Sequence, residues 1–106
     1  PGVLESAYEA CLAYELNQLG YQVERQKELP IHYHGLCINA GYRMDLLVNN
    51  KVVVELKAAE SILPIHHAQL LSYLRLAQKR IGLLFNFHTL HLRDGITRKI
   101  NDRLSA

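Results

Sequence analysis

The sequence predicts an α/β fold in which a mixed central β-sheet is flanked by helices. Two segments, residues 3–19 and 64–80, carry apolar residues at helical spacing, and short apolar segments of strand length lie between and after them. The predicted order is therefore one helix, three strands, a second helix and one or two further strands. Because the second helix connects two strands, it permits a parallel crossover in the sheet. The length suits one domain, residues 1–106.

The first helix is predicted from apolar residues that recur every three or four positions through residues 3–19. Gly20 is typical of the residue that follows a helix. At about 100° per residue, Glu15 falls near the middle of the apolar stripe and Glu5 at its edge. Since a carboxylate on a core face needs a partner, we expect Glu15 to pair with a neighbouring donor.

The segment after the first helix predicts β-structure. Residues 21–35 alternate well enough for a strand, with a bend or bulge at Pro30, which has no N–H to donate. The pattern then predicts a hairpin of residues 36–48 and 51–58 around the Asn-Asn pair at 49–50, since asparagine tolerates positive φ.

The second helix begins at Pro64, whose missing N–H costs nothing in a first turn. Its predicted apolar face comprises Leu70, Leu74 and Ala77, with His66 and Tyr73 alongside and Gln69 at the margin. After it we expect a buried strand at 81–87, a shorter one at 89–92 and a last short strand within 96–106.

Composition excludes few functions but indicates the cellular compartment. A net charge of +2 is far below that of a dedicated non-specific nucleic-acid binder. Cys11 and Cys37 lack Cys-x-x-Cys spacing, so we expect buried free thiols in a reducing compartment. No apolar run approaches the roughly 18 residues of a membrane span, and no targeting signal opens the chain. We expect a cytoplasmic location and no membrane partner.

Asp45, Glu55 and Lys57 lie among the apolar residues of the hairpin. Glu55 and Lys57 share a face, because residues i and i+2 of a strand do. A two-residue turn would place Asp45 and Glu55 on opposite faces. A turn of odd length, or a bulge, would set them directly opposite each other, with Cα atoms roughly 4.5 to 5.5 Å apart.

Two interpretations of these charges are open. In the first, Asp45 and Glu55 make surface salt bridges with Lys57 or Arg43. The apolar residues on both sides argue against it, because burying two like charges costs several kcal/mol unless they share a cation. In the second interpretation the two carboxylates are buried and share a cation. Lys57 is one such cation, and a divalent metal ion is another.

The same residues resemble a known family. An Asp-x9-Glu-Leu-Lys hairpin followed by a helix is similar to the PD-(D/E)XK nuclease superfamily of restriction endonucleases and lambda-type exonucleases. More closely, "PGVLESAYEACLAYEL", "YRMDLLVNNKVVVELKA" and "PIHHAQLLSYLRL" resemble the GxxExxY family of small bacterial proteins, with Gly2, Glu5 and Tyr8 as its motif. The resemblance implies a restriction-endonuclease-like core. Members of that family resemble one another in a further N-terminal helix, which we expect this chain to lack. A homodimer or a complex with a partner protein is therefore an alternative to the monomer.

The resemblance also implies site residues. Asp45 and Glu55 match the metal-binding carboxylates, with the Leu56 carbonyl as an additional ligand, and Glu5 matches an acidic residue that reaches the metal directly or through water. Lys57 matches the lysine that orients the attacking water and steadies the phosphate charge.

Three residues of the second helix match further positions. Gln69 and Tyr73 match a Gln-x3-Tyr motif and share a helix face. A polar rim around a packed tyrosine would explain them equally well. His66 matches a position often filled by histidine, and a core or cap histidine is the alternative.

The resemblance implies a metal-dependent nuclease that hydrolyses phosphodiester bonds of DNA or RNA with Mg²⁺ or Mn²⁺. Hard carboxylate ligands suit Mg²⁺. Two other hypotheses are kept: a catalytically silent module that binds nucleic acid or a protein, and a metal-dependent hydrolase of small phosphorylated metabolites with a deep pocket.

Overall fold

The structure is a computed structural model that describes residues 2–39, 41–88 and 95–102. Its elements follow the chain in this order: α1 (Gly2–Gln18), β1 (Val23–Glu28), β2 (Ile31–Tyr33), β3 (Leu36–Ile38), β4 (Arg43–Val48), β5 (Val52–Lys57), α2 (Pro64–Ala77), β6 (Ile81–Asn86) and β7 (Ile96–Ile100).

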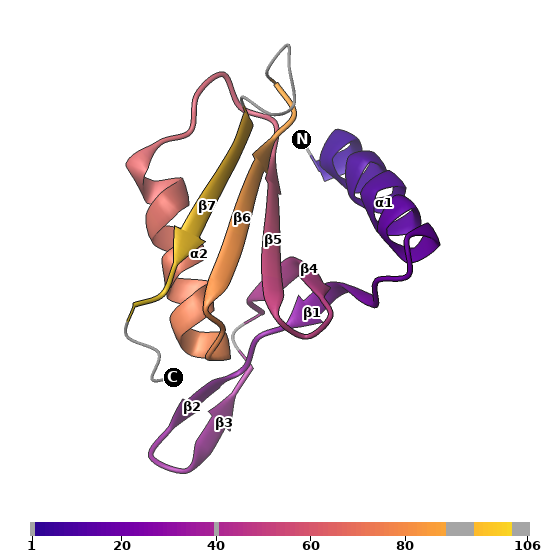
Figure 1. The fold of residues 1–106 in the computed structure, drawn as a ribbon. Coiled ribbons are helices and arrows are strands. Elements are labelled where there is room, and N and C mark those ends of the chain that lie inside the picture. The colour runs from indigo at the N-terminus through magenta and orange to yellow at the C-terminus, as the bar shows by residue number, and fades with distance from the viewer. Residues whose placement is uncertain (1, 40, 89–94, 103–106) are drawn as a thin grey trace.

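The main sheet has five strands in the order β1-β4-β5-β6-β7. β5 and β6 are parallel, connected through α2, and the other neighbours are antiparallel. The two helices lie on opposite sides of this sheet (Figure 1). The predicted α/β class with a mixed sheet is therefore confirmed, and the arrangement is consistent with a restriction-endonuclease-like fold. Neither described helix is long and apolar enough to span a membrane.

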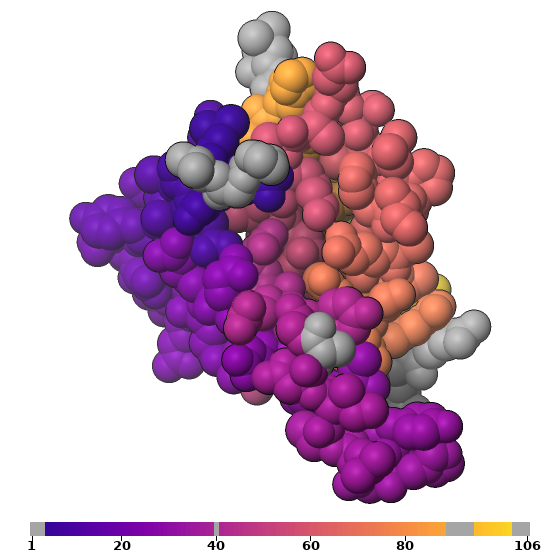
Figure 2. All heavy atoms as spheres, turned by 180° about the vertical axis from the view of Figure 1, so that it is seen from behind, coloured from indigo at the N-terminus to yellow at the C-terminus, as the bar shows by residue number. Residues whose placement is uncertain are grey.

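The strands before β4 differ from the prediction. β2 and β3 pair only with each other, as a small hairpin that projects from the body of the molecule (Figures 1 and 2). The segments 21–35 and 36–48, each predicted as one strand, are thus both interrupted. Pro30 has no N–H to continue a ladder, and the positive φ of His34 (47°) and Gly35 (80°) forms a tight turn between β2 and β3. Five strands, not three, separate α1 from α2.

The end of the chain agrees with the prediction where it is described. β6 is followed by β7, which pairs Phe85 with Ile96 and Ile81 with Ile100. The shorter strand expected at 89–92 lies outside the described residues.

The α2 side of the sheet holds the larger core cluster. Leu70, Tyr73 and Leu74 are buried and Ala77 packs against them, as the helical pattern predicts. The absence of a side chain at Gly82 on β6 lets Leu70 approach closely, because an added Cβ would lie only 2.8 Å from Leu70 Cδ1.

On the other side, α1 is rotated relative to its predicted stripe. Among residues 4–18 of this helix, Glu9 and Ala13 are buried and Glu15 is exposed, so the prediction that Glu15 faces the core was wrong. The reason is that α1 packs against β1, β4 and β5, so it buries its Glu9–Ala13 side. Cys11 and Cys37 are also exposed, which corrects the expectation of buried thiols.

Candidate active site

The β4–β5 hairpin has the odd register. Val48 pairs with Val52, Leu47 with Val53 and Leu46 with Val54. The Val48 carbonyl accepts a hydrogen bond from the Lys51 N–H at 2.9 Å, so Lys51 is an extra residue between the turn and the ladder. Asn49 and Asn50 both have positive φ, 52° and 55°. Asn49 Oδ1 also accepts from the Gln22 N–H, and the Asn49 N–H donates to the Gln22 carbonyl, which ties the turn to the start of β1.

Continued toward the other end of the hairpin, this register sets Asp45 opposite Glu55. There side chains replace the backbone partners of the ladder. The Asp45 N–H donates to Glu55 Oε2 at 2.9 Å, and the Leu56 N–H donates to Asp45 Oδ2 at 2.8 Å. The two strands thus open where the two carboxylates lie, and the freed backbone donors hold both carboxylates.

The alternation of β4 also breaks at Asp45. Met44 and Leu47 belong to the same core cluster, on the α2 side, although they are three residues apart, while Leu46 packs on the α1 side. The register of β1 and β4 sets Gln26 across from Asp45, and Gln26 has a φ of 50° inside its strand. Such a left-handed residue reorients a strand locally. Asp45, at this break in the alternation, lines the pocket on the α1 side of the sheet.

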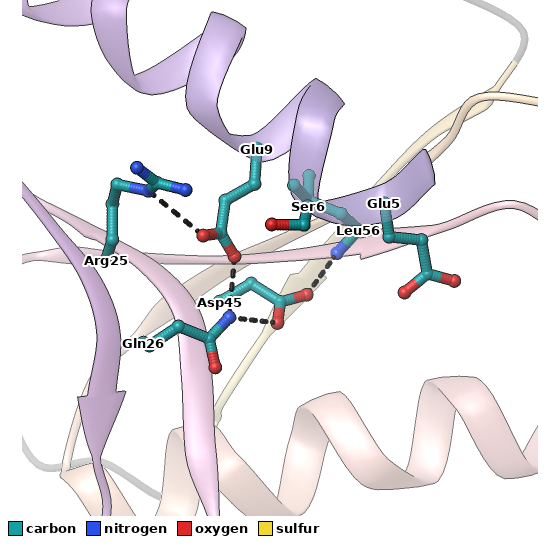
Figure 3. Close-up of a pocket in the computed structure, with 7 residues that line it drawn as sticks. All are labelled: Glu5, Ser6, Glu9, Arg25, Gln26, Asp45 and Leu56. Carbon is teal, nitrogen blue, oxygen red and sulfur yellow. Dashed lines mark hydrogen bonds and ion pairs between the residues drawn. The ribbon is translucent and has the colours of Figure 1, made fainter. Parts of the chain in front are cut away.

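Asp45 lines a pocket of about 460 Å³ between α1 and the opened hairpin (Figure 3). The lining residues are Glu5, Ser6, Glu9, Arg25, Gln26, Asp45 and Leu56. Four of these seven are ionisable and three of the four are acidic, so the pocket is suited to a cation or to a group that brings one.

Glu55 lies at the floor of the opened ladder on the α2 side, between Val54 and Leu56, which both point toward α1. It is only 4% exposed. Burial, and next the neighbouring charge of Asp45, raise the pKa of Glu55 to about 8. Burial also raises the pKa of Asp45, opposed by its hydrogen bond from the Leu56 N–H. The pair therefore lacks a full positive counter-charge.

Lys57 and two residues of α2 form a chain on the same side of the sheet as Glu55. Lys57 Nζ donates to Gln69 Oε1 at 3.2 Å, and Gln69 Nε2 donates to the Tyr73 hydroxyl at 3.2 Å. Burial raises the pKa of Tyr73, with Glu55 as the second cause. Gln69 is thus a contact of Lys57, and the lysine is held beside the Glu55 carboxylate.

His66 has a local structural contact. Its Nδ1 accepts a hydrogen bond from the Leu63 N–H at 3.0 Å, and the His66 N–H donates to the Leu63 carbonyl at 2.9 Å. These two bonds cap the start of α2, which agrees with the alternative of a cap histidine.

The candidate residues are not all in one place. Glu5 and Asp45 line the pocket beneath α1, whereas Glu55 and Lys57 face α2. Among the described residues no group of three His, Cys, Asp or Glu side chains is close enough to hold a metal ion. Asp45 and Glu55 are joined through Asp45's own backbone, and Glu5 extends from α1 on the far side of Ser6 from Glu9 (Figure 3).

Four residues of the pocket escaped the sequence reasoning: Ser6, Glu9, Arg25 and Gln26. Glu9 is 4% exposed and accepts bonds from Arg25 Nε at 3.0 Å and from Gln26 Nε2 at 2.6 Å. Gln26 Nε2 also lies 3.3 Å from Asp45 Oδ1. No sequence pattern singles out Glu9, because its burial, together with that of Ala13 four residues later, depends on which strands α1 packs against. Gln26 depends on a backbone distortion that no pattern indicates.

The salt-bridge interpretation of the two carboxylates is not supported. Arg43 pairs with Glu28, and in the described part of the chain neither Asp45 nor Glu55 makes a salt bridge.

Comparison with known proteins gives three findings. A family model described as the PD-(D/E)XK nuclease superfamily matches residues 1–99. A solved protein, titled "Crystal structure of SSO0001", is 28% identical with a TM-score of 0.61, and the match covers 98% of this chain and 53% of that one. The chain therefore spans about half the length of that protein. No curated protein matches.

Nucleases of the matched superfamily generally use divalent metal ions. Matched over nearly all of its length, this chain belongs to the PD-(D/E)XK nuclease superfamily.

Proposed function

We propose that this chain is a metal-dependent nuclease domain that hydrolyses phosphodiester bonds in DNA or RNA. The observation that carries the proposal is the opened ladder, where two carboxylates lie together without a full positive counter-charge. A hairpin stabilised only by packing would gain nothing from that arrangement, because unneutralised buried carboxylates cost free energy.

The donors fit a hard divalent cation. Asp45, Glu55 and the Leu56 carbonyl are the proposed ligands, and Glu5, which lines the same pocket as Asp45, is a further one. All are oxygen donors, and Mg²⁺ commonly takes one or two carboxylates and retains several waters, so Asp45 and Glu55 would suffice and Glu5 would reach the ion directly or through a water. Mn²⁺ has similar preferences. When bound, the ion would neutralise charge on the phosphate and activate water.

Lys57 would act on the phosphate and the attacking water. Its ammonium group offers three donors, one of which bonds Gln69. Within the described residues its other donors make no hydrogen bond, and they would orient a water or stabilise charge that develops on a phosphate oxygen. Preorganised donors of this kind are worth about 10² to 10³ in rate. We propose Gln69, Tyr73 and His66 as supports of this lysine and of the start of α2.

The finer family assignment is also a proposal. Gly2, Glu5 and Tyr8 fall on the first turns of α1, and Tyr8 stacks on Phe87 with ring centroids 4.1 Å apart. This contact gives the tyrosine of a GxxExxY motif a structural role, attaching α1 to the end of β6. Nucleic acid is the proposed partner, and a cytoplasmic location stays a prediction.

The test is cleavage of single- and double-stranded DNA and RNA in Mg²⁺ and in Mn²⁺. We expect Lys57→Ala and Glu55→Ala to lose cleavage, and the matched controls Lys51→Ala and Glu60→Ala, at exposed positions, to retain it. If the two site variants cleave as fast as wild type, the proposal is wrong. If wild type binds Mn²⁺ but cleaves nothing, a silent binding module is the better description.

A further inference from the structure

Glu9 is a buried carboxylate that the proposed metal site does not use. It is 4% exposed, on the side of α1 that faces the pocket. Both of its oxygens are bonded: Oε2 by Arg25 Nε at 3.0 Å and Oε1 by Gln26 Nε2 at 2.6 Å. Hydrogen bonds to an ionised carboxylate are strong, so Arg25 and Gln26 together fix the orientation of the Glu9 carboxylate.

Gln26 is the link between Glu9 and Asp45. Its amide nitrogen has two N–H groups and lies 2.6 Å from Glu9 Oε1 and 3.3 Å from Asp45 Oδ1 (Figure 3). Only the nitrogen end of the amide can donate, so the Glu9 carboxylate fixes which end of the amide faces Asp45. The backbone of Gln26, at a φ of 50°, is in a region that non-glycine residues rarely adopt, and this brings the amide under α1.

Asp45 is thereby held at both oxygens. Oδ2 accepts from the Leu56 N–H at 2.8 Å, and Oδ1 faces the Gln26 amide. With one of these donors alone the carboxylate could rotate about its χ2 torsion, which is a broad torsion for aspartate. With both donors in place the carboxylate plane is defined.

We infer that Glu9 and Gln26 are positioning residues for Asp45: Glu9, anchored by Arg25, orients the Gln26 amide, and that amide sets the plane of the Asp45 carboxylate. The inference rests on the proposed function for its purpose, which is to present Asp45 to a divalent ion. Residues that orient a metal ligand in this way typically change metal affinity by about 10- to 100-fold when they are replaced.

The arrangement predicts a specific non-additivity. Because Glu9 acts through Gln26, removal of the Gln26 amide leaves Glu9 nothing to orient. The double variant Glu9→Gln/Gln26→Ala should therefore bind Mn²⁺ as weakly as Gln26→Ala alone. A direct ligand role for Glu9 would instead make the two losses multiply.

The experiment compares wild type, Glu9→Gln, Gln26→Ala and the double variant, each without and with metal. Glu15→Gln and Gln18→Ala serve as controls at exposed positions of α1. Without metal, NMR measures the exchange rate of the Leu56 amide and the carboxyl carbon shift of Asp45. We expect faster exchange and a changed carboxyl shift in Gln26→Ala and Glu9→Gln, with no further change in the double variant. With metal, titration of Mn²⁺ should show a Kd raised by about 10- to 100-fold in each variant and no larger rise in the double variant.

The two arms separate failure of the inference from failure of the proposed function. If wild type binds no Mn²⁺, the proposed function fails, and the NMR arm alone decides the inference. If Asp45 and Leu56 give wild-type signals in both single variants, or if the Mn²⁺ losses multiply, the positioning role is wrong. Should Glu9→Gln fail to fold, Gln26→Ala, on an exposed edge strand, still decides by the same two readouts whether the Gln26 amide sets the Asp45 carboxylate, and wild-type readouts there would overturn the inference.

Discussion

The two ends of the β4–β5 hairpin are built from the same two strands but behave differently. At the turn end, valines and leucines pair in a regular ladder and are buried on both faces of the sheet. At the opposite end the ladder opens, and two carboxylates take the hydrogen bonds of Asp45 and Leu56 that a neighbouring strand would otherwise accept. The turn end therefore carries stability, whereas the open end gives up some stability to hold two carboxyl groups close together.

The largest effect is expected at the open end. Asp45→Asn keeps the shape of the side chain but removes its charge, and its amide can present a donor to the Leu56 N–H instead of an acceptor. We expect cleavage to fall by at least about 10² to 10³, measured as single-turnover rates in Mn²⁺. A rate within threefold of wild type would show that Asp45 has no part in the reaction.

Glu55→Gln should stabilise the metal-free protein at neutral and alkaline pH. The pKa of Glu55 is raised from 4.5 to about 8 in the folded state, so its contribution to stability is fully present below pH 4.5 and is lost as pH rises through about 8. A glutamine keeps an acceptor for the Asp45 N–H but cannot ionise. Each pKa unit corresponds to about 1.4 kcal/mol, and the rise from 4.5 to about 8 spans about 3.5 units, so we expect a gain of several kcal/mol, at most about 5, at pH 8 and none below pH 4.5. Urea unfolding at the two pH values measures it, and equal effects at both would contradict the account.

At the turn end, Val53→Ala should lower stability without touching the site. Val53 is 0% exposed and packs in the α2-side core. Loss of two buried methyl groups should cost about 1 to 3 kcal/mol in the free energy of unfolding. Mn²⁺ affinity should stay within a factor of about two. A large loss of affinity would mean that the two ends are not independent.

The smallest effect is expected at the start of α2. His66→Ala removes the side-chain acceptor of the Leu63 N–H, and loss of such a cap costs about 0.5 to 2 kcal/mol. Thermal unfolding measures the change. If His66→Ala instead abolishes cleavage at unchanged stability, His66 contacts the substrate rather than only capping the helix.

Much of the fold was predictable because it depends on local patterns. The apolar spacing of Leu70, Leu74 and Ala77 defined the buried side of α2, and Pro64 its start. The β2–β3 hairpin was not predicted, because alternation continues across Pro30 and only the missing N–H separates the strands. The burial of Glu9 instead of Glu15 was also not predictable, since it depends on which strands α1 packs against.

For the candidate site, the sequence supplied the charged residues but not their arrangement. Residue spacing alone left the register of the hairpin open. The register is determined by Lys51, the extra residue after the turn, and by the hydrogen bonds between Asn49 and Gln22. Gln26 has no sequence signal at all, because its role follows from one left-handed backbone conformation inside a strand.

We propose that a divalent cation bound at the opened end of the hairpin takes the place of the proton on Glu55. Calorimetric titration of Mn²⁺ at pH 7, in buffers of different ionisation enthalpy, tests it most directly, since metal binding to a protonated carboxyl releases the proton. With a Glu55 pKa of about 8, we predict one site that releases close to one proton per ion, and a site that is lost in Asp45→Asn. Binding without proton release, or binding that Asp45→Asn leaves unchanged, would contradict the account.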